Sequence, residues 1–257
     1  MTETIDVRGC KTHVRRMGKG PTLLYLHGMR GLYGEPAFLQ GLAERFQVIA
    51  PDHPGFGNSE DPEWLESIGD LAYFYADFID ALGLRDVHLV GHSIGGWIAL
   101  QLAVRSSANL RSLSLVSSAG IRVKGVPRAD TFLVSPEELA NLLFVDGKLA
   151  KAFVEQEADP ERFGFNFKNQ VAAAKLTWQP RLCDPQLSKW LHRIAIPTFI
   201  LWGDSDRIIP PQYAEALHAA IAGSTVQILP QCGHVPTIEK PDLFVGAIAG
   251  FIGKVAS

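Results

Sequence analysis

The chain of 257 residues has few cysteines and no marked excess of charge. Its three cysteines, Cys10, Cys183 and Cys232, are widely spaced and form no CxxC pair, which argues against a disulfide framework and favours a reducing compartment. The formal net charge is −3, and no stripe of lysine and arginine stands out. A nucleic-acid partner is therefore not expected.

Long apolar runs are also absent. No segment approaches the roughly 18 consecutive apolar residues that a membrane helix needs. Residues 1–6 contain two acids and no apolar core, unlike a signal peptide. Metal-ligand spacings, a P-loop and a dinucleotide fingerprint are missing as well. We expect a cytoplasmic protein with a small-molecule substrate, no metal, no cofactor and no membrane partner, and a homodimer stays open.

What the sequence does contain is an alternation of short apolar runs and helical patterns. Nearly unbroken apolar runs are typical of strands buried on both faces of a parallel sheet. They occur at 23–26, 46–50, 87–90, 113–116, 198–202 and 226–229, with weaker strand candidates at 3–8 and 11–16. Helical stripes such as the one at 68–82 lie between them. The pattern predicts an α/β fold with a doubly wound, mostly parallel sheet flanked by helices.

Residues 120–195 interrupt this alternation. They show helical patterns without a convincing buried strand, and they are rich in aromatic side chains. We interpret them as a helical cap (lid) inserted into a core domain formed by residues 1–119 and 196–257. Open α/β sheets bind ligands at the carboxyl ends of their strands, so the cap is expected to cover a pocket there.

The strongest local motif is Gly91-His92-Ser93-Ile94-Gly95. It follows the predicted strand at 87–90 and opens a helical run, the strand–turn–helix setting of a nucleophile elbow. Gly91 and Gly95 lack the Cβ atoms that would clash where strand and helix pass close together. The turn would hold the Ser93 hydroxyl above the sheet edge, in front of the positive end of the helix.

A serine hydroxyl is a weak nucleophile near neutral pH and needs a base, which in turn needs an orienting acid. Asp204 and Asp206 follow the predicted strand at 198–202, and His234 follows the one at 226–229. The order serine, acid, histidine is the order that accompanies the elbow. The residues alone leave both aspartates open as the acid.

Taken together, the motifs resemble the α/β-hydrolase family over essentially the whole chain. They are, in order, His27-Gly28, the segment 52–59, the elbow, the Gly-Asp-x-Asp loop at 203–210 and Gly233-His234. The resemblance implies Ser93 as nucleophile, Asp206 as triad acid with Asp204 as the alternative, and His234 as general base. It also implies an oxyanion hole formed by the backbone N–H groups of Met29 and Ile94.

Other side chains are candidates for the substrate pocket. They are His27, Phe132, Phe144, Trp178 and Val235. Arg181 in the cap is either a carboxylate-binding residue or an ordinary surface arginine. His92 is expected to point away from Ser93, because neighbouring strand residues face opposite ways.

The resemblance implies a carboxylesterase-like serine hydrolase that cleaves small to medium apolar esters or lactones through an acyl-enzyme. An alternative is a C–C bond hydrolase acting on aromatic ring-cleavage products of the meta-cleavage type. Val235 and His92 depart from the tryptophan and asparagine that such enzymes commonly carry. A non-catalytic ligand-binding receptor is a lesser alternative, since fold alone does not fix function.

Overall fold

Eight strands form one sheet within residues 1–256, the part of the chain that the computed structural model describes. The spatial order is β1-β2-β4-β3-β5-β6-β7-β8. The strands are β1 (Thr2–Val7), β2 (Cys10–Met17), β3 (Thr22–Leu26), β4 (Gln47–Pro51), β5 (Val87–His92), β6 (Leu110–Val116), β7 (Thr198–Gly203) and β8 (Thr225–Leu229). Strands β3 to β8 pair in parallel, and β1 and β2 form an antiparallel start. The predicted fold class is confirmed.

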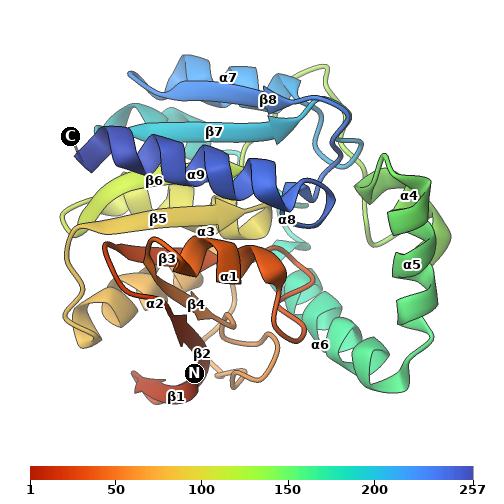
Figure 1. Ribbon diagram of the computed structural model, residues 1–257, viewed down its shortest axis with the longest axis horizontal. Helices are drawn as coiled ribbons and strands as arrows, with labels where there is room; N and C mark the ends of the chain where they lie inside the picture. The colour runs from red at the N-terminus through yellow and green to blue at the C-terminus, as the bar shows by residue number, and fades with distance from the viewer. Residues whose placement is uncertain (257) are drawn as a thin grey trace.

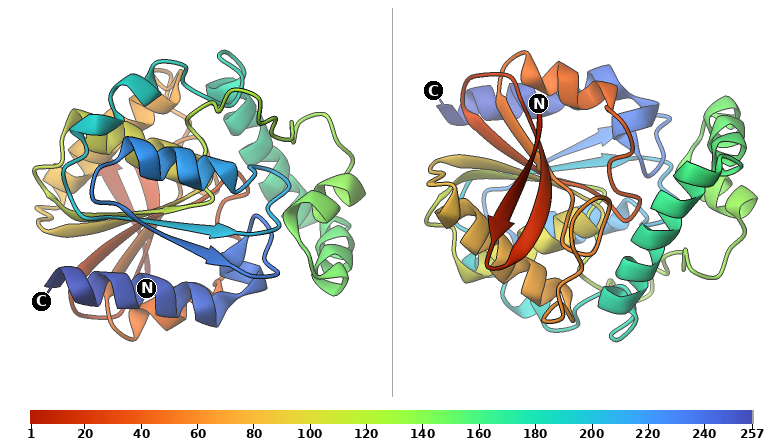
Figure 2. Two further views of the ribbon diagram at one scale, coloured as in Figure 1. Left: turned by 90° about the horizontal axis from the view of Figure 1, so that it is seen from above. Right: turned by 90° about the horizontal axis from the view of Figure 1, so that it is seen from below.

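Helices cover both faces of this sheet (Figures 1 and 2). On one face α2 (Ile68–Ala81), α3 (Ile94–Arg105) and α7 (Gln212–Ala220) share a core with the sheet. On the other, α1 (Ala37–Ala43) and α9 (Pro241–Ala256) do the same. Strand β3 is apolar throughout because both of its faces are buried. Leu24 lies in the core with α2, α3 and α7, and Leu23 in the core with α1 and α9.

Strand β8 departs from the sequence prediction. Its burial was expected on both faces, but Thr225 to Ile228 are exposed and only Leu229 is buried. The strand lies at the edge of the sheet, where β7 is its one neighbour in the sheet order. An apolar run of four residues does not by itself distinguish a central strand from an edge strand.

The segment between β6 and β7 is mainly helical. Helices α4 (Pro136–Leu143), α5 (Gly147–Glu157) and α6 (Pro160–Thr177) lie beyond the carboxyl ends of the strands (Figure 1). Two short 3₁₀ turns, Leu187–Lys189 and Leu191–Arg193, lead back to the sheet. Leu187 and Leu191 belong to the core that α2, α3 and α7 share with the sheet. The division into core and cap remains our interpretation. In residues 1–256 we find no helix with the length and apolarity needed to cross a bilayer.

Ser93 alone connects β5 to α3, and its backbone has φ 54° and ψ −115°. This left-handed conformation is unfavourable for a residue with a side chain. It brings strand and helix so close that a Cβ on Gly91 would lie 2.4 Å from the carbonyl oxygen of Gly95. A Cβ on Gly95 would lie 2.1 Å from the carbonyl oxygen of Leu26. The turn therefore requires glycine at both positions.

We expect Gly95→Ala to lower the free energy of unfolding by at least about 2 kcal/mol, because the new methyl group meets fixed backbone rather than a movable side chain. Gly246 in α9 is a matched control, since its Cβ would enter open space. Gly246→Ala should stabilise the protein by about 0.5–1 kcal/mol through helix propensity. Urea unfolding of both variants checks this, and equal effects would refute the close crossing.

Candidate active site

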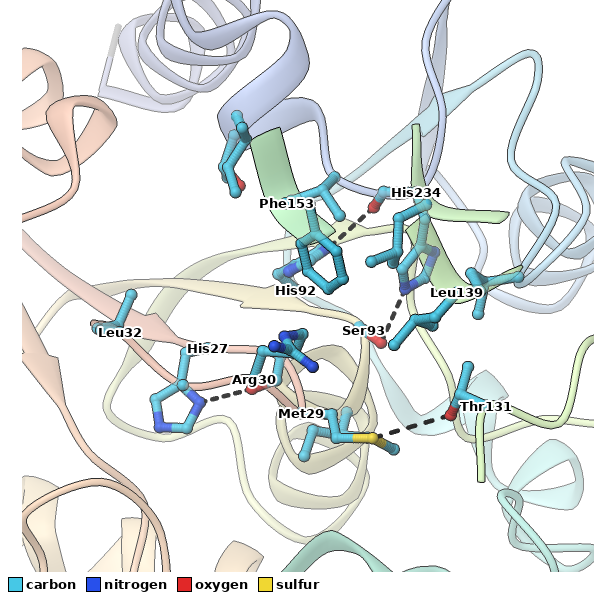
Figure 3. Close-up of a pocket in the computed structure, with 18 of the residues that line it drawn as sticks. His27, Met29, Arg30, Leu32, His92, Ser93, Thr131, Leu139, Phe153 and His234 are labelled. Carbon is cyan, nitrogen blue, oxygen red and sulfur yellow. Dashed lines mark hydrogen bonds between the residues drawn. The ribbon is translucent and has the colours of Figure 1, made fainter. Parts of the chain in front are cut away.

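Loops at the carboxyl ends of β5, β7 and β8 bring Ser93, Asp206 and His234 together. His234 Nε2 lies 3.0 Å from Ser93 Oγ, and His234 Nδ1 lies 2.8 Å from Asp206 Oδ2 (Figure 3 shows the former contact). The carboxylate can only accept, so Nδ1 carries a proton, and in the neutral form of the ring Nε2 accepts from the serine hydroxyl. The three side chains form one directed chain of hydrogen bonds.

Asp206 has the surroundings of a fixed acceptor. Its Oδ1 accepts from the backbone N–H groups of Ile208 and Ile209, both at 2.9 Å, and the residue is 4% exposed. Asp204, the alternative acid, is exposed and bonds elsewhere, to Gln231 N–H and to the Ser205 hydroxyl. The hydrogen bond from Ser205 is the main cause that lowers the pKa of Asp204. The structure thus places Asp206 against His234, and Asp204 on the outside of the loop.

Met29 and Ile94 both line the cavity into which Ser93 faces. Ile94 is the first residue of α3, where backbone N–H groups have no partner within the helix. Met29 follows β3, and its sulfur accepts a weak hydrogen bond from the Thr131 hydroxyl at 3.8 Å (Figure 3). The places of both residues beside Ser93 agree with the oxyanion hole predicted from the sequence. That their backbone N–H groups form it stays a prediction.

His27 lines the same cavity, as predicted, but both of its ring nitrogens are occupied. The backbone N–H of His53 donates to His27 Nε2 at 3.1 Å, so the ring proton is on Nδ1 and is donated to the Gly28 carbonyl at 2.7 Å. His53 is held in turn by Tyr75, whose hydroxyl donates to Nδ1 at 2.5 Å. Burial lowers the pKa of His27 to about 3 and that of His53 well below its ordinary value. These neutral rings fix the loop that carries Met29.

His92 was expected to point away from Ser93, and this prediction is wrong. The ring lines the cavity, and its Nε2–H donates to the backbone carbonyl of His234 at 2.9 Å (Figure 3). The strand alternation assumed for His92 ends at the left-handed turn of the next residue. Burial lowers the pKa of His92 to about 4, so the ring is neutral at pH 7 and supports the loop of His234.

Comparison with known proteins decides the family. A model of the alpha/beta hydrolase fold matches residues 21–241. The chain belongs to the α/β-hydrolase family. A 2-hydroxymuconate semialdehyde hydrolase of Pseudomonas putida is 30% identical over 96% of this chain and 92% of that protein. Lipase 3 of a Moraxella strain is 25% identical over 86% of this chain and 73% of its own length.

Solved structures agree with this assignment. A bacterial membrane phospholipase A has a TM-score of 0.83 and 26% identity, covering 100% of this chain and 87% of its own. A serine hydrolase involved in carbazole degradation has a TM-score of 0.79 and 25% identity, covering 99% of both chains. The hydrolase therefore resembles enzymes with different substrates, and its own substrate has to be sought in its cavity.

The cavity of this α/β-hydrolase has a volume of about 440 Å³ and lies between the sheet edge and helices α4 to α6. Three of the five predicted pocket residues line it, namely His27, Phe144 and Val235. Phe132 and Trp178 do not line it, so those predictions are wrong.

The guanidinium of Arg181 explains where Phe132 and Trp178 lie. It stacks 3.9 Å from the Trp178 ring and 5.0 Å from that of Phe132, and it pairs with Asp130 at 2.7 Å. Within this cluster Trp178 is 57% exposed, whereas Phe132 is partly buried against the hydrophobic core. Arg181 is thus engaged by its own surface partners, which fits an ordinary surface arginine.

Sequence reasoning missed several residues that line the cavity. Leu139 on α4 and Phe153 on α5 supply apolar surface, and Arg162, Asn166 and Gln170 on α6 supply polar groups. The last three are spaced by four residues, so they share one helix face. That spacing is visible in the sequence, but it was not recognised because polar helix faces usually meet solvent.

A carboxylate ties the His234 loop to the helices over the cavity. Glu239, at the end of α8 (Pro236–Glu239), accepts from Gly233 N–H at 2.5 Å through Oε2. Its Oε1 accepts from the N–H groups of Val145 and Asp146 at 2.6 and 2.9 Å, between α4 and α5. The His234 N–H also donates to the Leu143 carbonyl at 2.8 Å. The His234 loop and the cavity wall are therefore held as one unit. No metal-binding cluster of His, Cys, Asp and Glu is found in residues 1–256.

The buried neutral histidines make stability depend on pH. Folded His92 has a pKa of about 4, whereas an unfolded histidine titrates near 6.5, so the unfolded state binds more protons between these values. Stability should then be full above about pH 6.5 and fall as the pH drops toward 4. Each such histidine contributes on the order of 1 kcal/mol per pH unit in this window.

His92→Asn tests this contribution, because the amide can still donate to the His234 carbonyl but does not titrate. Urea unfolding at pH 8 and at pH 5 should show a smaller loss of stability on acidification for the variant than for the wild type. An equal loss in both proteins would contradict the burial of a neutral ring at position 92.

Proposed function

We propose that this hydrolase cleaves small to medium, largely apolar carboxylic esters or lactones through an acyl-enzyme on Ser93. The observation that supports the proposal most is the continuous chain of hydrogen bonds from Ser93 Oγ through His234 to Asp206. It joins a nucleophile to a base, and that base to an orienting acid, at the end of a cavity lined mainly by apolar side chains.

In the proposed reaction, Ser93 Oγ attacks the ester carbonyl carbon while its proton moves to His234 Nε2. The tetrahedral intermediate collapses, the bond to the leaving oxygen breaks, and that oxygen takes the proton from His234. Water then attacks the acyl-enzyme, gives one proton to His234 and forms the acid. Ser93 Oγ leaves and recovers this proton. Asp206 stabilises the imidazolium in both halves.

The negative oxygen of each tetrahedral intermediate needs donors that are already in place. We assign this role to the backbone N–H groups of Met29 and Ile94, which flank Ser93 in the cavity. The buried His27–His53 pair keeps the loop that carries Met29 rigid. Loss of one such donor typically costs about 3 kcal/mol of barrier height.

A second candidate is the hydrolysis of a C–C bond in an aromatic ring-cleavage product. Its support is that 2-hydroxymuconate semialdehyde hydrolases of two Pseudomonas strains are 29% and 30% identical over more than nine-tenths of each chain. A dienone-cleavage assay, followed by the loss of the substrate's visible absorbance, separates this activity from ester hydrolysis.

The proposal also includes a cytoplasmic location and a cap formed by residues 120–195. All three cysteines are free and buried, which suits a reducing compartment. Helices α4 to α6 of this segment contribute cavity walls, while Ser93, Asp206 and His234 come from loops at the carboxyl ends of the strands, which suits a cap that selects the substrate.

The direct test is a panel of p-nitrophenyl esters with a Ser93→Ala variant. We expect kcat/KM to fall by at least about 1000-fold in the variant, because the nucleophile is lost. Ser188→Ala, at an exposed serine in the cap segment, is the control and should keep wild-type activity. A fluorophosphonate probe should add one label to the wild type at Ser93. Undiminished hydrolysis by Ser93→Ala would eliminate the assigned nucleophile.

A further inference from the structure

The residues that line the cavity include three arginines and no aspartate or glutamate. The arginines are Arg30 after β3, Arg128 before α4 and Arg162 on α6. Guanidinium groups stay protonated at all physiological pH values. The wall of the cavity therefore carries positive charge, although most of its surface is apolar.

Two of these arginines have partners within the protein. Arg30 pairs with Glu157 at the end of α5 and lies 4.6 Å above the Phe153 ring. Arg128 donates to the backbone carbonyls of Leu182 and Arg181, both at 2.5 Å. These contacts fix both guanidinium groups, and in the case of Arg30 they also neutralise its charge.

In the part of the chain that the structure describes, Arg162 has neither an ion-pair partner nor a backbone carbonyl to hold its guanidinium. In residues 1–256 no carboxylate lies within ion-pair distance of its guanidinium, and its Nε is shielded from solvent without a hydrogen-bond partner. Its guanidinium carbon lies 5.2 Å from the centre of the Tyr33 ring, a cation–π contact that does not neutralise its charge. Burial lowers the pKa of Arg30, the carboxylate of Glu157 opposes this, and the nearby charge of Arg162 lowers it further, so Arg162 adds a second positive charge beside the Arg30–Glu157 pair.

Helix α6 is turned with its polar side toward the cavity. Arg162, Asn166 and Gln170 line the cavity at intervals of four residues. Phe163, Phe167 and Val171, one position along, are each more than half exposed. A helix packed only to form a cap core would bury the aromatic side and expose the arginine. The observed orientation suits a polar ligand in the cavity.

We propose that the cavity binds substrates that carry a free carboxylate, which Arg162 receives while the ester carbonyl lies at Ser93. The substrate class is then the half-ester of a dicarboxylic acid, with an apolar chain along Leu139, Phe144 and Phe153. A carboxylate would neutralise the charge of Arg162 and accept hydrogen bonds from the terminal N–H groups of its guanidinium. The inference rests on the ester hydrolysis proposed above.

The test compares two esters of nearly equal size, mono(4-nitrophenyl) adipate and methyl 4-nitrophenyl adipate, in which the carboxylate is blocked. We expect the wild type to prefer the free acid in kcat/KM by about 10- to 100-fold. Arg162→Gln should abolish the preference and leave hydrolysis of the blocked ester in place. Arg162→Lys should keep part of the preference, since it retains the charge but not the planar fork.

Arg122→Gln, at an exposed arginine in the same segment, is the matched control and should behave as the wild type. Cleavage of both esters with no preference, or a preference that survives Arg162→Gln, would overturn the inference while leaving ester hydrolysis intact. Calorimetric titration with adipate itself separates the two proposals. Binding to the wild type and to Arg122→Gln but not to Arg162→Gln supports the carboxylate site even if neither ester is cleaved, and equal binding to all three overturns it.

Discussion

The left-handed backbone of Ser93 is the constraint on which the rest of the site depends. A conformation of this kind costs on the order of 1–3 kcal/mol and persists only where the surrounding structure enforces it. Here the enforcement comes from the close crossing of β5 and α3, which in turn requires glycine at 91 and 95. The strain is concentrated at the one residue whose side chain must stand clear of the sheet.

The second constraint is that His234 must reach Ser93 from a distant part of the chain. His234 lies 141 residues beyond Ser93, and its loop is fixed from several sides. His92 holds its carbonyl, the Leu143 carbonyl accepts its N–H, and Glu239 joins the preceding glycine to the start of α5. Because Leu143 belongs to α4 and Glu239 bonds to the backbone between α4 and α5, a shift of α4 would also move His234.

The sheet and the three polar residues at its edge could be predicted because they depend on local patterns. An apolar run marks each strand, the next loop carries the polar residue, and parallel strands bring their carboxyl ends to one edge. The exposure of β8 could not be predicted in this way, since whether a strand lies at the edge is a property of the whole sheet. The direction of the His92 side chain was mispredicted because the alternation of a strand stops at the turn that follows it.

The cavity wall was harder to predict for a different reason. Phe132 and Trp178 are aromatic, but the sequence does not say whether a given position of an inserted segment faces the cavity or not. Arg162 is the converse case, a charged residue whose helix face points inward. Its significance depends on the fact that no carboxylate of residues 1–256 lies within ion-pair distance of its guanidinium, which only the three-dimensional arrangement shows.

His234 is held by Asp206 and not by Asp204, so that its other nitrogen faces Ser93. Proton NMR in water observes the Nδ1 proton of His234 directly, because a hydrogen bond to a buried carboxylate shifts such a proton strongly to low field. The resonance can be assigned by its loss in His234→Gln. The structure predicts that it is present in the wild type and in Asp204→Asn and missing from its low-field position in Asp206→Asn. A resonance that survives in Asp206→Asn and disappears in Asp204→Asn would contradict the account.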